Sequence, residues 1–127
     1  MTNSNNEQGM WSLGLVFKSF GYALNGIKHV FKNERNFRLH VLSSILVLIC
    51  AFYFNCDLIE FALLVIVMSV VLITEIINSA IEYTWDKLEP NHHPVIGIIK
   101  DAMSGSVLIA SLSALIVGIM VVLRHLI

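Results

Sequence analysis

The sequence predicts an all-α membrane protein with three transmembrane helices and an N-terminal amphipathic helix at the membrane surface. Of its 127 residues, 57% are hydrophobic and only 13% are charged, a balance that is typical of membrane proteins. Three apolar runs, 39–54, 58–81 and 102–123, approach or exceed the length that crosses a bilayer. Before the first run, apolar residues recur at three- and four-residue steps, which favours a helix with one apolar face.

We expect one membrane domain over residues 11–127, preceded by a disordered segment, 1–10. The first nine residues are polar and lack a basic stretch leading into an apolar one, so no cleavable signal peptide is expected. Aromatic residues such as Phe20 and Phe31 and lysines such as Lys18 and Lys32 occupy different helix faces, as in helices that lie in a membrane interface. The expected elements are a surface helix at about 11–33 and spans at about 37–54, 58–86 and 100–124.

The distribution of charge predicts the topology. Most lysines and arginines precede the first span or lie between the second and third, which puts the N-terminal segment and the 83–101 loop in the cytoplasm. The net charge of −1 gives no indication of a nucleic-acid partner. Cys50 and Cys56 have no spacing typical of a metal or redox site, so we interpret both as apolar packing residues rather than a disulfide. Small residues at every fourth position of the third span, Ala110, Ala114 and Gly118 among them, indicate close helix packing.

A polar stripe runs along the end of the second span. On a helix, Asn78 lies about 60° from Glu75, while Glu82 and Asp86 each lie within roughly 20° of Glu75, so the stripe is about 16 Å long. Carboxylates at membrane depth are costly and face a bundle interior or a wet cavity. A purely structural polar seam is the alternative. Because a three-span chain encloses little interior, we expect a homo-oligomer with sites between subunits.

Further polar groups are expected at the same cytoplasmic border, namely Glu34, Lys100 and Asp101. Carboxylates bind Mg²⁺, a lysine stabilises a transferring phosphoryl group, and another carboxylate can take the proton of an attacking hydroxyl. Together they suggest phosphoryl transfer from a nucleotide to a membrane alcohol. Both groups also have a structural interpretation. Glu34 can pair with a neighbouring arginine, and Lys100 can be a snorkelling membrane anchor. Other functional classes are a transporter or proton relay that uses Glu75 and Glu82, and a structural assembly protein.

Three motifs resemble the prokaryotic diacylglycerol kinase family, which includes the undecaprenol kinases. They are Asn33-Glu34-Arg35-Asn36-Phe37-Arg38, Glu75-Ile76-Ile77-Asn78-Ser79-Ala80-Ile81-Glu82 with Asp86, and His93-Pro94 followed by Lys100-Asp101. The similarity covers roughly residues 17–115. It implies a homotrimer in the bacterial inner (cytoplasmic) membrane, with composite sites at the cytoplasmic face, Mg²⁺ as cofactor, ATP as phosphoryl donor and a membrane lipid alcohol as acceptor.

The same resemblance implies a role for individual residues. Glu75 is expected to be the general base, and Glu34 and Glu82 are expected to hold the metal. The expected nucleotide contacts are Tyr22, Asn78, Asp86, His93, Lys100 and Asp101. The expected lipid contacts are Asn36, Arg38, Glu75 and Ser104.

The resemblance favours undecaprenol as the acceptor, with diacylglycerol second. Leu15 and Val16 stand where some diacylglycerol kinases carry an arginine, so no phosphate contact is assigned there. The sequence leaves open which lipid is phosphorylated, the number of Mg²⁺ ions, which subunit supplies which group, and the role of the His92-His93 pair.

Overall fold

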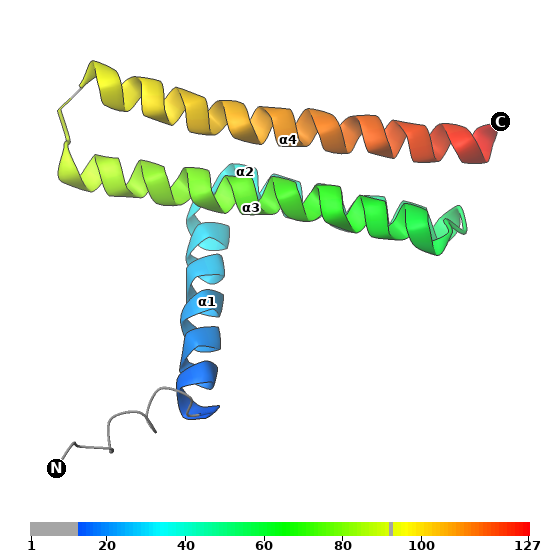
Figure 1. Cartoon of the computed structure of the whole chain (residues 1–127), viewed down its shortest axis with the longest axis horizontal. Helices are drawn as coiled ribbons and strands as arrows, with labels where there is room; N and C mark the ends of the chain where they lie inside the picture. The colour runs from blue at the N-terminus through cyan, green and yellow to red at the C-terminus, as the bar shows by residue number, and fades with distance from the viewer. Residues whose placement is uncertain (1–12, 92) are drawn as a thin grey trace, which may run out of the picture. The chain divides into compact units, whose positions relative to one another are not determined.

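The computed structural model describes residues 13–91 and 93–127, and its elements are four α-helices (Figure 1). They are α1 (Leu13–Asn33), α2 (Arg35–Tyr53), α3 (Leu58–Leu88) and α4 (Pro94–Leu126). Over the described residues this confirms the all-α class. α2, α3 and α4 are each long and apolar enough to cross a membrane. The disorder predicted for residues 1–10, the first residues of the predicted surface helix and His92 lie outside the described residues.

The chain divides after Asn33 into two compact units. The first contains α1, in which large apolar side chains such as Phe17 and Phe20 are exposed. Its position at the membrane surface stays a prediction. The second unit, Glu34–Ile127, contains the three long helices.

Within the second unit, α2 and α4 both pack against α3, so α3 is the central helix (Figure 1). A small core of Ala51, Leu64, Met68 and Val121 joins the three helices. Most other large apolar side chains are exposed, including Leu108 and Ile116 on α4. Because lipid tails are as apolar as these side chains, apolar contact alone does little to hold the helices together in a bilayer. Polar contacts at the helix ends therefore contribute a larger share of the free energy that holds the helices together.

The beginning of α3 is fixed by a capping box. Asp57 Oδ1 accepts hydrogen bonds from the amides of Ile59 and Glu60, both at 2.9 Å, and Glu60 Oε2 accepts one from the Asp57 amide at 2.9 Å. The Glu60 amide is the main group that lowers the pKa of Asp57, and Arg124 lowers it further. Because the folded-state pKa is lowered, this stabilisation is present above the ordinary aspartate pKa and is lost as pH falls through the lowered value.

The last turn of α4 is bound to this cap. Arg124 Nη1 lies 3.0 Å from Glu60 Oε1 and 3.2 Å from Asp57 Oδ2, and His125 Nε2 lies 3.0 Å from Glu60 Oε2. Cys50 and Cys56 are both free, as expected. Burial raises the pKa of the Cys56 thiol, and the nearby carboxylates of Glu60 and Asp57 raise it further.

At the opposite end of the bundle, α4 begins earlier than the predicted start near residue 100. Pro94 occupies the first turn of α4, where its missing N–H costs nothing, and His93 is the N-cap. His93 Nδ1 accepts a hydrogen bond from the Val95 amide at 3.3 Å. The short connection between Leu88 and Pro94 contains the other proline of the chain, Pro90. Lys100 consequently lies inside a helix rather than at its opening.

Candidate functional site

The C-terminal half of α3 carries a row of polar residues that changes from buried to exposed. Glu75 and Asn78 are 3% and 9% exposed, Glu82 is half-buried, and Asp86 is exposed. Asn78 Nδ2 donates a hydrogen bond to Glu82 Oε1 at 3.2 Å. Ser79, which is almost fully buried, donates to the Glu75 carbonyl at 2.9 Å, so its hydroxyl is satisfied within the helix.

Glu75 lies among charged groups from two helices. It interacts electrostatically with His40 and Glu34 at the beginning of α2 and with Glu82 on α3. Glu34 is the N-cap residue of α2, yet its side chain makes no capping hydrogen bond there. Its carboxylate interacts instead with the Tyr83 hydroxyl of α3. The structure therefore brings Glu34 to the row on α3, although the two lie about forty residues apart in the sequence. We call Glu34, His40, Glu75, Asn78 and Glu82 the carboxylate cluster.

One turn beyond Glu82, an ion pair connects α3 to α4. The Lys100 ammonium contacts the Asp86 carboxylate, and the Asp86 side chain is 66% exposed. Exposed ion pairs stabilise a fold by about 1 kcal/mol or less, so this pair adds little to folding and can readily exchange for another partner. Lys100 is thereby held beside an acidic row near the C-terminal end of α3, where the helix dipole also favours a cation.

The remaining predicted site residues lie outside the cluster. Asn36 and Arg38 are exposed at the beginning of α2, and Asp101 and Ser104 are exposed on α4. Over residues 13–91 and 93–127, no hydrogen bond or ion pair joins Asn36, Asp101 or Ser104 to the cluster. Tyr22 is exposed on α1.

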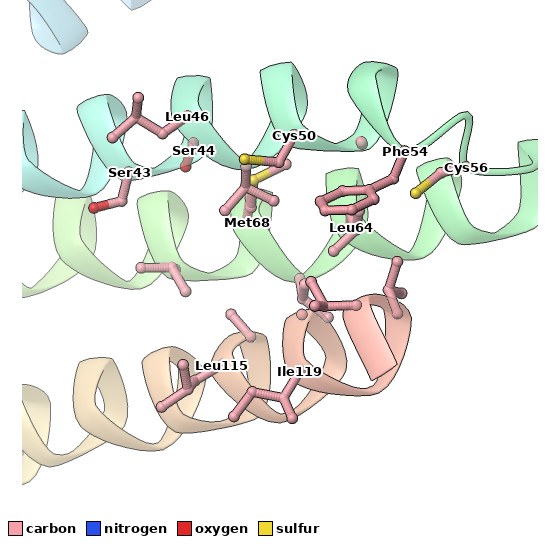
Figure 2. A pocket seen from close by; sticks show the side chains of 18 of the residues that line it. Ser43, Ser44, Leu46, Cys50, Phe54, Cys56, Leu64, Met68, Leu115 and Ile119 are labelled. Carbon is pink, nitrogen blue, oxygen red and sulfur yellow. The ribbon is translucent and has the colours of Figure 1, made fainter. Parts of the chain in front are cut away.

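An apolar groove of about 600 Å³ runs between α2 and α4 over α3 (Figure 2). Met68 and Leu64 of α3 line it in the middle of the view, with Cys50 and Phe54 on one side and Leu115 and Ile119 of α4 on the other. Its polar lining includes His40, Ser43 and Ser44 near the beginning of α2. His40 both lines the groove and interacts with Glu75, so the groove and the carboxylate cluster meet at this residue.

Sequence reasoning missed His40 and the groove. Its only signal for His40 was a histidine on the first turns of a span, which is more often a snorkelling group. The small residues Ala114 and Gly118, interpreted as helix-packing positions, line the groove, whereas Ala110 is buried as that interpretation expects.

Residues 21–122 match the family described as prokaryotic diacylglycerol kinase. The chain is 34% identical over 114 residues to the undecaprenol kinase of Bacillus subtilis, covering 90% of this chain and 93% of that protein. It is 33% identical over 110 residues to the diacylglycerol kinase of Escherichia coli K12, covering 87% and 90%. A diacylglycerol kinase of Synechocystis is 35% identical over 101 residues, covering 79% of this chain and 58% of that protein.

These matches extend through α2 and α3 and over most of α4, so they include the carboxylate cluster and Lys100. Three helices able to span a membrane agree with a membrane enzyme. The chain therefore belongs to the prokaryotic diacylglycerol kinase family and is an integral-membrane lipid kinase.

Proposed function

We propose that the protein transfers the γ-phosphoryl group of ATP to the hydroxyl of a membrane lipid, undecaprenol in the first place and diacylglycerol in the second. The observation that carries the proposal is a buried Glu75 among Glu34, His40 and Glu82, with Lys100 close by on α4. A relative named undecaprenol kinase matches over nearly its whole length, which supports the first acceptor. A transporter is less well supported, because the acids gather at one end of the bundle with a lysine rather than along a span.

Glu75 is proposed as the general base. Its side chain is shielded from water but adjoins His40, which also lines the apolar groove. A lipid hydroxyl that enters from the groove past His40 would therefore approach the Glu75 carboxylate in a place shielded from bulk water. Proton removal by a positioned carboxylate makes the hydroxyl oxygen a better nucleophile toward the γ-phosphorus.

The residues of the cluster fit a magnesium ion. Glu34 and Glu82 supply carboxylate oxygens, and Mg²⁺ prefers such ligands together with substrate phosphates. Asn78 Oδ1 is buried and, within the described residues, has no hydrogen-bond partner. An unsatisfied buried oxygen costs free energy unless something binds it, and a hydrated cation beside it would do so. Mg²⁺ held by Glu34 and Glu82 would offset the negative charge of the ATP phosphates.

On the nucleotide side, Lys100 is proposed to leave Asp86 and contact the ATP phosphates. The Asp86 side chain of this ion pair is mostly exposed, so the exchange costs little. The other proposed nucleotide contacts are Tyr22, Asn78, Asp86, His93 and Asp101. Asn36, Arg38 and Ser104 are proposed to contact the lipid substrate, because their amide, guanidinium and hydroxyl side chains are exposed.

The apolar groove is proposed to hold the hydrocarbon chain of the acceptor. Its polar lining at His40, Ser43 and Ser44 lies at the Glu75 end, and the remaining lining is mostly apolar, which matches an alcohol with a long hydrocarbon tail.

We further propose a homotrimer whose active sites are shared between neighbours and face the cytoplasm. The support is that large apolar side chains on all three spans are exposed in one chain, and that basic residues gather at one end.

Filling the groove is expected to weaken acceptor binding selectively. An added Cβ at Gly118 meets nothing within 4 Å, so Gly118→Phe projects into the groove without displacing backbone. The KM for the lipid should rise by roughly tenfold, the scale of one misfitted apolar group, while the KM for ATP stays unchanged. Met120→Phe adds a ring to an exposed α4 position outside the groove lining and should change neither. Unchanged lipid kinetics in Gly118→Phe would remove the groove from substrate binding.

The acceptor is tested by incubating the purified protein in mixed micelles with radiolabelled ATP, Mg²⁺ and either undecaprenol or diacylglycerol. We expect label in both lipids, with the higher kcat/KM for undecaprenol. A higher value for diacylglycerol would reverse the order of acceptors. Equal inertness toward both alcohols, in protein that elutes as a folded oligomer, would refute the proposed function.

A further inference from the structure

The end of the bundle opposite the carboxylate cluster holds a second group of reactive side chains. Cys56, Glu60 and His125 each offer a ligand atom, and their sulfur, oxygen and nitrogen atoms all lie within 4.8 Å of one another. Glu60 and Glu75 are fifteen residues apart on α3, which places them about 22 Å apart along the helix axis. This group is therefore separate from the proposed phosphoryl-transfer site.

The three side chains are held by well-defined local structure. Cys56 immediately precedes the N-cap of α3, and its amide donates a hydrogen bond to the Ala51 carbonyl at 3.0 Å. Glu60 is buried and anchored by the Asp57 amide. His125 lies in the last turn of α4. A site assembled from two helices and a capped turn is largely preformed, so a ligand would have little backbone to order.

The charges of the group are incompletely balanced. The single guanidinium of Arg124 contacts both the Asp57 and the Glu60 carboxylates. When His125 is counted as a neutral imidazole and Cys56 as a thiol, the formal charges of Arg124, Asp57 and Glu60 sum to −1. A divalent cation bound by the Cys56 thiolate, the Glu60 carboxylate and the neutral imidazole would bring the sum to zero, because the thiolate adds one negative charge and the cation adds two positive ones.

We propose that Cys56, Glu60 and His125 bind a divalent transition metal of the zinc class. Thiolate and imidazole ligands select such ions over Mg²⁺ and Ca²⁺, which prefer oxygen. Three protein ligands leave a fourth tetrahedral position for water. Binding releases one proton to solvent, the one on the Cys56 sulfur. The single proton of the neutral His125, which Nε2 shares with Glu60 Oε2 at 3.0 Å, moves to Nδ1 and leaves Nε2 able to bind the metal. The metal then ties the end of α4 to the turn before α3.

Cobalt titration of the metal-free protein in detergent tests the site, because a thiolate bound to Co²⁺ gives a charge-transfer absorption band that oxygen ligands do not give. We expect one such band that saturates at one Co²⁺ per chain and is abolished by Zn²⁺. Cys56→Ser should remove the band, whereas the matched variant Cys50→Ser should keep it. His125→Gln should weaken binding by about tenfold or more.

Cobalt bound at the carboxylate cluster would lack the charge-transfer band, so the readout does not depend on the kinase proposal or on activity. Absence of the band from the wild-type protein would overturn the zinc-class site, and so would its persistence in Cys56→Ser. Should Cys56→Ser fail to fold, the site is tested by two other results: weaker Co²⁺ binding in His125→Gln, and displacement of Co²⁺ by Zn²⁺ in the wild-type protein.

Discussion

Replacing Glu75 with glutamine is expected to lower kcat by about 10²–10⁴-fold, the usual contribution of a general base. Glutamine keeps the shape and hydrogen-bonding capacity of the side chain but cannot accept the proton of the lipid hydroxyl. Glu75 is 3% exposed, so removing its charge from a site that also holds Glu34 and Glu82 should not unfold the protein. The measurement is initial-rate kinetics with saturating ATP and lipid, together with the melting temperature.

Glu89→Gln is a matched control for this variant. Glu89 is exposed and follows the last turn of α3, so the same chemical change falls at the same end of the bundle but outside the carboxylate cluster. Its kcat should equal that of the unsubstituted protein. A Glu75→Gln variant with normal turnover would take Glu75 out of the base role, and one that loses turnover together with its melting transition would indicate a structural role instead.

The three spans could be predicted from the sequence because each is a long apolar run, and hydropathy in such runs outweighs local detail. The start of α4 could not be placed as well. Pro94 stands at the first helical position, where proline is favoured, so α4 begins six residues before the predicted start near residue 100. The capping box had a readable signal, Asp57-Leu58-Ile59-Glu60 before an apolar run, which sequence reasoning passed over.

Residue spacing predicted the candidate site only within one helix, and the association of Glu34 and Lys100 with that helix came from charge at the membrane border and from the family resemblance. Asn78 and Glu82 are one turn apart, so helix geometry predicted their proximity. The approach of Glu34 to Glu75 depends on how α2 packs against α3, which no periodicity specifies. The same holds for Glu60 and His125, which contact each other across 65 residues of sequence. A spacing rule could not have found Cys56 as a candidate metal ligand, because one of its two partners, His125, lies near the far end of the chain.

Polar contacts sit at both ends of the bundle, while the middle is apolar. Asp57 and Glu60 hold the end of α4 at one side, and Asp86 holds Lys100 at the other. The two pairs differ in burial, since the Glu60 side chain is 6% exposed and that of Asp86 is 66% exposed. A buried charge that loses its partner is strongly destabilising, whereas an exposed one is not. Loss of the Glu60 contacts is therefore expected to cost more stability than loss of the Asp86–Lys100 pair.

Lys100→Met is accordingly expected to impair catalysis with little loss of stability. The variant keeps the length of the side chain but removes the ammonium that would face the transferring phosphoryl group, so kcat/KM for ATP should fall by about 10²–10³-fold. The free energy of unfolding should fall by about 1 kcal/mol or less, because the partner Asp86 is mostly exposed. Steady-state kinetics with varied ATP and a thermal melt of the same preparation measure the two effects.

Lys87→Met is the matched control, since Lys87 is exposed in the last turn of α3 and removal of its charge falls close to Asp86 in the sequence. It should leave kcat/KM for ATP nearly unchanged. Asp86→Asn tests whether the ion pair only positions Lys100. It releases the Lys100 ammonium but keeps its charge, so kcat/KM for ATP should fall less than in Lys100→Met. If Lys100→Met keeps its ATP kinetics, or if Lys87→Met loses as much, the ammonium at this border acts as a membrane anchor rather than on the nucleotide.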